Sequence, residues 1–551
     1  MTAGRSRMGR LAAIGFVSLL SLVSACDGER EPSPASGGDS AQEAVPAWPK
    51  CPFSGITHTV TQYGAKGDGI ADDGAAIQSA IDAASDAGGG TVYFPPGTYL
   101  LGTVIPGGGW LNNRLITLQS NVRLLGAGDQ TILKMKDHLL DQSDAQHANF
   151  LHNRHLDGKD DVNICVENLT FDGNAANNLT PLGAARPAVM IRFIGGARVW
   201  IHDNRFLNGA GHNDVQLVDD TTFGGTSPNR EAYIVGNVFL NGGHYTGTGN
   251  VENVYNSDFS FGYSEWASTV AQGNHIEQQN PDIALRGYTG GFEIHGSDSV
   301  FVDNTIIGCY PAMYVASTPK FLRNVLVSRN VLNRCWGGIN FWIGKAMSDV
   351  TISDNTISVY APPGTLGESD GIFLPRGQDL NWTEPYAKAS KVERLILARN
   401  TITSALPADS TIVAGGMAVH SLWDSSIVDN LISGMTGSGI TVSGSPWGTK
   451  GLNIERNVVQ DCGKAWDDAG LARNSGIRLH LPGHASVPDE DFWSDGITVK
   501  GNLIANTASV GSFGWIYCGM TITPLGSYAD KNTNLLVGEN TFSNLPVDRY
   551  P

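Results

Sequence analysis

The sequence predicts an all-β solenoid, in which one stack of coils replaces the several domains that a chain of 551 residues would otherwise suggest. The first observation is a repeat, because short runs of alternating apolar and polar residues recur at 292–307, 324–344, 349–358, 394–403 and 425–445. The second is the alternation itself, since a period of two residues is typical of strands. The third is an Asn that closes most of these runs, at intervals that indicate stacked coils.

The closing asparagines allow the coils to be counted. An Asn tolerates the left-handed backbone of a tight turn, and its amide can bond to the Asn one coil away. We therefore expect a ladder of stacked asparagines and about 11–13 coils. Such a ladder explains these residues without any function. Its expected members are Asn168, Asn204, Asn237, Asn274, Asn304, Asn330, Asn355, Asn400, Asn430, Asn457, Asn502 and Asn540.

The N-terminus has the layout of an export signal. Three arginines between residues 5 and 10 precede an apolar run at 11–23, which is too short to span a membrane. The residues VSAC that end at Cys26 resemble a bacterial lipobox, in which the Cys is lipidated. The alternative is a plain signal peptide with an incidental Cys. The following residues are rich in Ser, Pro, Gly, Glu and Ala, which is typical of a flexible tether.

These features predict the domain order. A lipoprotein-type signal peptide and lipobox occupy 1–26, a flexible tether occupies 27–52, and the solenoid domain occupies 53–551. The protein would be exported, lipidated on Cys26 and anchored to a bacterial membrane, either in the periplasm or at the cell surface. We expect a monomer that contacts the membrane only through its lipid anchor.

Charge and cysteines narrow the classes of partner. The formal net charge of −17 argues against binding to nucleic acid or to an anionic membrane surface. Export permits disulfides. Cys309 and Cys335 each follow an expected ladder Asn by five residues, so they should stack in adjacent coils about 4.8 Å apart. Either a disulfide or two buried thiols would fit this placement. No partner can be assigned to Cys51, Cys165, Cys462 and Cys518.

The segment 60–103 predicts a cap on one end of the solenoid. Asp72 or Asp73 can cap a helix whose apolar positions, from Ala76 to Ala84, recur at helical spacing. The strings YGAKGDG, AIQSAIDAA, GGGTVYFPPGTY and LTFDGN resemble the opening of the pectate-lyase-like, rhamnogalacturonase/epimerase-like superfamily. This resemblance implies a right-handed single-stranded parallel β-helix with an N-terminal capping helix at about 60–105. It also implies action on a polysaccharide, but no particular reaction.

Alternation assigns the side chains to the two faces of each strand. Phe292 and Ile294 should point into the coil, and Glu293 and His295 should point out. An outward row on a solenoid suits an extended polymer, because the sugars advance with the coils. Aligning the strands on one frame predicts an outward column of Met190, Gln216, Ser260, Glu293, Tyr314, Asn340 and Phe373, and beside it Arg192, Val218, Gly262, His295, Ala316, Trp342 and Pro375.

The middle of these columns collects acids, a His and aromatic residues. The predicted catalytic residues are Glu293, His295, Asp258 and Asp214, and the predicted substrate-binding residues are Arg286, Tyr314, Asn340, Trp342 and Arg192. Each has a structural alternative as a surface, turn or packing residue. The polygalacturonase motifs of the superfamily are absent in register, so typical polygalacturonase activity is disfavoured. EIHG at 293–296 is only loosely similar to an epimerase-type DPHE.

The predicted reaction is β-elimination on a uronate-containing glycan. Elimination needs a base for the proton next to the carboxylate, for which His295 and Tyr314 are candidates, and a cation that stabilises the resulting charge. Arg286 or Arg192 would hold the substrate carboxylate. Ca²⁺ is the ion that Asp214, Asp258 and Glu293 would bind through oxygen, although no cofactor is certain. An epimerase would use nearly the same groups.

Two alternatives stay open. An inverting glycoside hydrolase needs two carboxylates that leave room for a water. The backbones of Asp258 and Glu293 are expected about 8 Å apart, which suits that mechanism. The other alternative is a non-catalytic solenoid that binds glycan or forms an adhesive surface.

Overall fold

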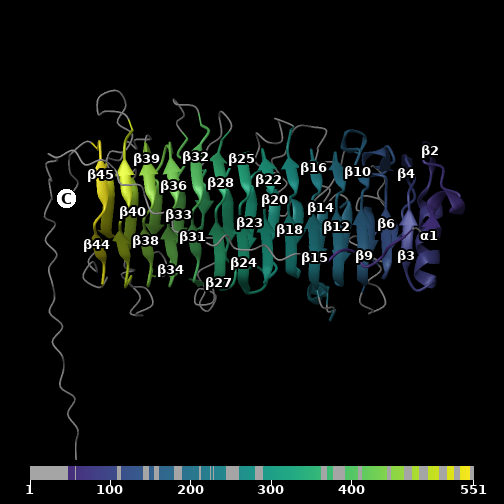
Figure 1. Cartoon of the computed structure of the whole chain (residues 1–551), viewed down its shortest axis with the longest axis horizontal. Helices are drawn as coiled ribbons and strands as arrows, with labels where there is room; N and C mark the ends of the chain where they lie inside the picture. Colours follow the sequence, from purple (N-terminus) through teal and green to yellow (C-terminus); the bar gives the residue numbers. More distant parts are fainter. Residues whose placement is uncertain are drawn as a thin grey trace, which may run out of the picture. The chain divides into compact units, whose positions relative to one another are not determined.

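Three parallel β-sheets, to which successive coils contribute strands, form the β-helix (Figure 1). The computed structural model describes residues 48–55, 57–107, 113–140, 148–153, 161–178, 189–209, 213–223, 225–226, 229–242, 260–279, 290–361, 369–375, 391–406, 412–443, 448–463, 475–482, 494–507, 518–525 and 534–545. Residues 47–551 form one compact unit. The expected right-handed parallel β-helix is confirmed by the three sheets, whose paired strands are all parallel. Among the described residues, no helix is both long and apolar enough to cross a membrane.

The first sheet has 17 strands, because two coils each contribute two short strands in place of one. Its strands are β1 (His58–Thr59), β3 (Gly90–Tyr93), β6 (Val122–Leu125), β9 (Val162–Glu167), β12 (Ala197–His202), β15 (Arg230–Val235), β18 (Ala267–Gln272), β21 (Ser299–Val302), β24 (Leu322–Ser328), β27 (Met347–Ser353), β30 (Val392–Glu393), β31 (Ile396–Ala398), β34 (Leu422–Trp423), β35 (Ser426–Val428), β38 (Asn453–Glu455), β41 (Thr498–Lys500) and β44 (Leu536–Gly538).

The second sheet has 15 strands, which follow one another in chain order. They are β2 (Asp68–Asp72), β4 (Gly97–Leu101), β7 (Thr131–Met135), β10 (Thr170–Asp172), β13 (Arg205–Leu207), β16 (Val238–Leu240), β19 (His275–Glu277), β22 (Thr305–Ile307), β25 (Val331–Cys335), β28 (Thr356–Val359), β32 (Thr401–Ser404), β36 (Leu431–Ser433), β39 (Val458–Gln460), β42 (Leu503–Ala505) and β45 (Thr541–Ser543).

The third sheet has 13 strands within the described ranges, which is the upper end of the expected 11–13 coils, whereas the second sheet has 15. They are β5 (Arg114–Leu118), β8 (Asn149–Asn153), β11 (Ile191–Ile194), β14 (Asn213–Val218), β17 (Ser260–Ser264), β20 (Gly290–Ile294), β23 (Met313–Ala316), β26 (Ile339–Trp342), β29 (Ile372–Phe373), β33 (Met417–His420), β37 (Ile440–Ser443), β40 (Ser475–Pro482) and β43 (Cys518–Leu525).

The cap is the helix α1 (Gly74–Asp86), which lies at the N-terminal end of the stack (Figure 1). Its buried residues include Ile77 and Ile81, which confirms the predicted apolar face. The Gln78 amide covers the free edge of β5, since it donates to the Thr117 carbonyl at 3.2 Å and accepts from the Thr117 N–H at 2.7 Å. Short 3-10 turns are η1 (Val60–Tyr63), η2 (Gly128–Gln130), η3 (Ala175–Asn177) and η4 (Asp220–Phe223).

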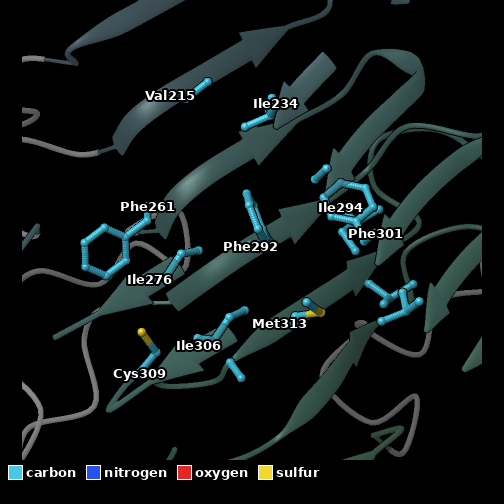
Figure 2. Close-up of a cluster of buried hydrophobic side chains, with 14 of the residues drawn as sticks. Val215, Ile234, Phe261, Ile276, Phe292, Ile294, Phe301, Ile306, Cys309 and Met313 are labelled. Carbon is cyan, nitrogen blue, oxygen red and sulfur yellow. The ribbon is translucent and has the colours of Figure 1, made fainter. Parts of the chain in front are cut away.

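The core lies inside the coils and follows the predicted alternation. Phe292 and Ile294 are buried within β20, as expected, together with Ile306 and Met313 from neighbouring strands (Figure 2). Aromatic side chains stack from coil to coil, with the rings of Phe206 and Phe239 centred 4.7 Å apart. Neighbouring parallel strands lie about 4.8 Å apart, so equivalent positions of successive coils pack on one another and often hold the same kind of residue.

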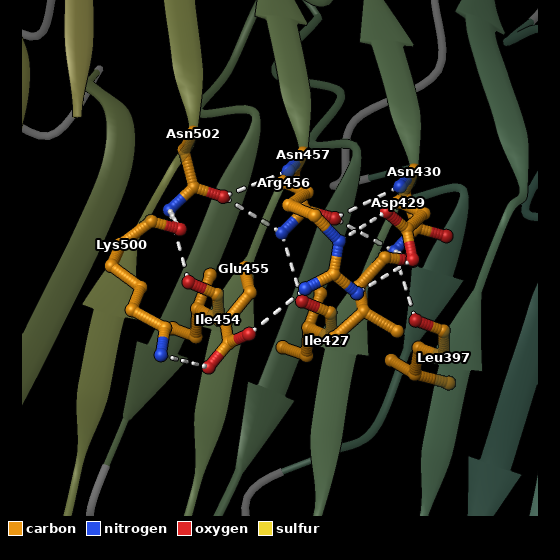
Figure 3. Close-up of polar contacts among 11 residues, drawn as sticks. Leu397, Ile427, Asp429, Asn430, Ile454, Glu455, Arg456, Asn457, Lys500 and Asn502 are labelled. Carbon is orange, nitrogen blue, oxygen red and sulfur yellow. Dashed lines mark hydrogen bonds and ion pairs between the residues drawn. The ribbon is translucent and has the colours of Figure 1, made fainter. Parts of the chain in front are cut away.

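The asparagine ladder is confirmed from Asn204 to Asn540. Asn457 is typical: its amide nitrogen donates to Asn502 Oδ1 at 3.0 Å and to the Ile427 carbonyl at 2.8 Å (Figure 3). The expected reason needs correction, because the left-handed residue is the one before the Asn, such as Arg456 with φ 53°. Asn168 is itself such a left-handed residue, and Leu169 N–H bonds Asn204 Oδ1 in its place.

The disulfide considered between Cys309 and Cys335 is not formed. Both thiols are free and buried, and burial raises the pKa of Cys335 to about 12. Stacked residues of parallel strands keep their Cβ atoms about 4.8 Å apart, beyond the roughly 3.5–4.5 Å that a disulfide needs. The structure instead joins Cys51 to Cys165, which are 114 residues apart.

This disulfide ties the start of the described chain to β9. Trp200 on the adjacent β12 donates its indole N–H to the Pro49 carbonyl at 2.6 Å, and Trp48 packs against His202. The last residues of the expected tether at 27–52 thus contact the first sheet. The rest of the tether, Cys26 and the signal peptide lie outside the described residues.

Replacing both Cys51 and Cys165 by Ser is expected to lower the free energy of unfolding by roughly 2–5 kcal/mol, because a cross-link over a long loop restricts the unfolded chain. Urea denaturation of the variant and the oxidised wild type measures the difference. Reduced wild type should match the variant. Equal stability of all three proteins would contradict the expectation.

Candidate active site on the third sheet

The register of the third sheet defines one outward column. Glu293 lies between Tyr263 and Tyr314, and Asn340 and Phe373 follow, as the frame predicted. Upstream of Glu293 the predicted frame is correct at Gln216, which pairs with Tyr263, but wrong at Met190 and Ser260. Met190 is 2% exposed and belongs to the core, while Ser260 pairs with Gly290. The column from β5 to β26 is Thr117, His152, Arg192, Gln216, Tyr263, Glu293, Tyr314 and Asn340.

Glu293 and His295 form a buried pair at the end of β20. Glu293 is only 4% exposed, and His295 Nε2 lies 3.1 Å from Glu293 Oε1. His295 Nδ1 donates to the Thr318 carbonyl at 2.5 Å. Burial opposes a charge on His295, but Glu293, the Thr318 carbonyl and Glu265 outweigh it, and the pKa of His295 is raised. Both ring nitrogens thus face acceptors, which favours an imidazolium beside a carboxylate.

Two neighbours that sequence reasoning missed complete this cluster. Tyr263 lies beside Glu293 in register, and its ring is centred 4.8 Å from the His295 ring. Its hydroxyl donates to Glu265 Oε1 at 2.6 Å. Glu265 Oε2 accepts the Asp219 N–H, also at 2.6 Å. The correct register of β17 would have placed both residues beside Glu293 and His295.

The column is more open on the C-terminal side of Glu293. Tyr314 is half-buried, and burial, with Tyr310 and Glu293 nearby, raises its pKa. Asn340 lies one strand further, and its buried Oδ1 has no hydrogen-bond partner among the described residues. Trp342, at the end of β26, is 46% exposed. These three predicted substrate-binding residues therefore lie in the two coils that follow Glu293, Tyr314 on β23 and the other two on β26.

Arg192 lies further from Glu293 than a single sugar reaches. Three strand steps separate the two residues, which places their backbones about 14 Å apart. Arg192 belongs to a basic stretch with Arg114 and His152, and all three side chains are buried. Burial, then the charges of Arg192 and Arg114, lower the pKa of His152 to about 3. Arg192 can therefore contact only a distant part of a bound glycan.

Asp214 is not beside Glu293. It lies at the start of β14, where a Cβ added at Gly209 or Gly242 would collide with its carboxylate. Asp258 and Arg286 lie outside the described residues. Within the described ranges, no group of three or more His, Cys, Asp or Glu side chains is arranged to hold a metal ion. The Ca²⁺ set of Asp214, Asp258 and Glu293 therefore stays a prediction.

Asp214 gives a test through pH. Burial raises its pKa to about 8, and Oδ2 has no hydrogen-bond partner within the described part of the chain. The folded protein thus keeps a proton that the unfolded chain releases near pH 4. Stability should fall as pH rises from about 4 to 8, by up to about 1.4 kcal/mol per pH unit from this residue.

The variant Asp214→Asn is expected to remove this part of the pH dependence and to unfold at higher urea than wild type at pH 8. Urea denaturation at pH 5, 6, 7 and 8 measures the effect. The exposed Asp129, replaced by Asn, serves as the control and should follow wild type. Parallel pH profiles for Asp214→Asn and wild type would refute the assignment.

Together, the fold and this cluster define a parallel β-helix with acids, an imidazole and phenols on one outward face. The family described as rhamnogalacturonase A/epimerase, pectate lyase-like, matches residues 58–340. The chain belongs to this family. The match includes Glu293, His295 and Tyr314.

Curated relatives resemble only part of the chain. Mannuronan C5-epimerase AlgE6 of Azotobacter vinelandii is 42% identical over 125 residues, which are 22% of this chain and 13% of the relative. Alginate lyase 7 of the same organism is 40% identical over 123 residues, again 22% and 13%. The chain thus matches about an eighth of these relatives. The tailspike of Escherichia coli bacteriophage HK620, solved with a pentasaccharide, shares the fold at 14% identity and a TM-score of 0.53, covering 87% of this chain and 80% of the tailspike.

Proposed function

We propose that this protein is a polysaccharide lyase that cleaves a uronate-containing glycan by β-elimination on the outward face of the third sheet. The observation that carries the proposal is the register that sets Tyr314 beside Glu293, with His295 bonded to Glu293. Membership of the family supports a polysaccharide substrate. We further propose that the protein is exported and anchored through a lipid on Cys26.

The elimination uses two groups with opposite protonation. Glu293, held as a carboxylate by the His295 imidazolium, takes the proton from carbon 5 of the uronate. The electron pair forms the double bond between carbons 4 and 5, and the bond from carbon 4 to the glycosidic oxygen breaks. Tyr314, whose raised pKa keeps it a phenol, gives its proton to that oxygen. Because their surroundings leave Glu293 deprotonated and Tyr314 protonated, Glu293 is the base and Tyr314 is the acid.

This assignment changes the role expected for His295. Its Nδ1 carries the hydrogen donated to the Thr318 carbonyl, and its Nε2 faces a carboxylate. An imidazolium between two acceptors has no lone pair for a substrate proton. His295 therefore orients Glu293 and keeps it ionised, and the base is Glu293.

Epimerisation at carbon 5 is the second candidate, favoured by the names of the mannuronan C5-epimerases that match part of the chain. It shares the first step with elimination. The proton then returns to the opposite face of carbon 5, and no bond to oxygen breaks.

Inverting hydrolysis is the third candidate, favoured by Glu265. Glu265 lies one strand before Glu293 and two residues further along, so their backbones are roughly 8 Å apart. Inverting glycosidases separate their carboxylates by about 6.5–9.5 Å. Glu265 thus takes the place that the sequence reasoning gave to Asp258.

Product analysis on polymannuronate, polyguluronate and polygalacturonate separates the candidates. Elimination predicts new ultraviolet absorbance with chain shortening. Deuterium from solvent at carbon 5 without shortening would instead establish the epimerase, and reducing ends without absorbance would establish the hydrolase. Binding to these polymers without any product would contradict the proposal that the protein is an enzyme and would favour a non-catalytic glycan-binding solenoid.

A further inference from the structure

A short segment after β23 turns back over the candidate site. We name residues 318–321 the strap. The Thr318 carbonyl accepts the hydrogen of His295 Nδ1, on the preceding coil. Lys320 Nζ pairs with Asp219 Oδ2, which follows β14 three strands earlier in the third sheet. The strap thus crosses the coils that carry His295 and Glu265.

The strap belongs to one ring of contacts with the proposed catalytic residues. From Lys320 the ring runs to Asp219, whose N–H bonds Glu265 Oε2 at 2.6 Å. Tyr263 then joins Glu265 to the His295 ring. His295 returns the ring to the strap at the Thr318 carbonyl. Lys320 therefore lies at the edge of the same cluster as Glu293.

Lys320 and Asp219 differ in how accessible their side chains are to a ligand. The Lys320 side chain is 49% exposed, whereas that of Asp219 is 8% exposed. Asp219 Oδ1 also accepts from the Thr221 N–H at 2.8 Å and from Asn229 Nδ2 at 3.1 Å. Asp219 would thus keep buried hydrogen bonds if Lys320 left it. A lysine is a compact charge on a flexible stem, so it can change partner within a few ångströms.

The charges of the cluster call for such a change. Three carboxylates, Asp219, Glu265 and Glu293, meet two cationic groups, Lys320 and His295. A further carboxylate from a glycan would be repelled unless a cation turned toward it. His295 is buried between Glu293 and the Thr318 carbonyl. Lys320 is the exposed cation of this cluster.

We propose that Lys320 is the specificity-determining residue for an acidic sugar, which it recognises by exchanging Asp219 for the carboxylate of a bound uronate. This inference rests on the proposed function for its substrate class, and it assigns the strap a binding role separate from the proton transfer at Glu293. Asp219 holds Lys320 in place until the glycan arrives.

Calorimetric binding tests the exchange without turnover. In the Glu293→Gln background, oligomannuronate and oligogalacturonate are compared with their methyl esters, which carry no charge. Adding Lys320→Met is expected to raise the Kd of the free acids at least tenfold and that of the esters less than twofold. Lys320→Arg should keep most of the affinity. Lys500→Met, at an exposed ion pair on β41, should change neither Kd.

Equal losses for acids and esters, or no loss for either, would overturn the role of Lys320. These outcomes leave the product analysis untouched, because turnover of the wild type tests the proposed function by itself. The two proposals can also fail separately. If the wild type forms no product but Lys320→Met loses affinity only for the free acids, the protein is not an enzyme and the acidic-sugar site stands.

Discussion

Glu293→Gln is expected to reduce kcat/KM on the uronate polymer by a factor on the order of 10³, because the amide cannot accept the proton from carbon 5. The amide keeps the volume of the carboxylate and a hydrogen bond to His295. The free energy of unfolding should therefore change by less than about 2 kcal/mol. Initial rates and urea denaturation measure both quantities.

A matched control lies on the second sheet. Glu277 and His275 on β19 form the same kind of pair, with Nε2 and Oε2 3.2 Å apart. Glu277→Gln should leave kcat/KM unchanged. If Glu293→Gln kept wild-type rates while folding normally, the reaction would lie elsewhere. His295→Ala is a poorer probe than the sequence suggests, because it leaves the buried Glu293 carboxylate without its counter-charge.

Asn330→Ala is expected to produce the largest loss of stability, about 3–5 kcal/mol in the free energy of unfolding. Asn330 is fully buried; its Oδ1 accepts from Asn304 at 2.9 Å, and its Nδ2 donates to the Phe301 carbonyl at 2.9 Å. Truncation leaves several buried polar groups without partners at once, and each costs about 1–3 kcal/mol. Urea denaturation measures the loss.

Asn333→Ala provides the control from the same coil. Asn333 is exposed, so its truncation should change the free energy of unfolding by no more than about 0.5 kcal/mol. Similar stabilities for the two variants would show that the ladder contributes little beyond marking the coils.

Local periodicity explains what could be predicted from the sequence. A strand alternates with a fixed period, so Phe292 and Ile294 were placed inside and Glu293 and His295 outside. The parallel stack repeats the same position in every coil, so the ladder from Asn204 to Asn540 followed from spacing alone. From β20 to β26 the coils are regular, and the predicted positions of Tyr314, Asn340 and Trp342 are correct.

Register at β11 and β17 could not be predicted, because the connections between successive strands of the third sheet vary in length there. The motif that resembled a strand frame at Met190 and Ser260 was out of register with Glu293. Tyr263 and Glu265 were missed for that reason. Alternation within one strand shows which side chains point outward. It does not show which residue of the next strand lies beside them, because that depends on how the strands pair.

Contacts between distant segments were also beyond sequence reasoning. Lys320 and Asp219 are 101 residues apart, and Cys51 and Cys165 are 114 apart. Neither pair follows the period of the coils, since one partner of each lies in a connection or a terminal segment. Such contacts depend on how a segment folds back over the stack.

The most direct test of the proposed site is a crystal structure of Glu293→Gln with a bound oligouronate. We expect a glycan on the outward face of the third sheet, with one carbon 5 beside residue 293. The next glycosidic oxygen should lie beside the Tyr314 hydroxyl, and a uronate carboxylate should pair with Lys320. A glycan bound on the first or second sheet, with the column from Tyr263 to Asn340 empty, would contradict it.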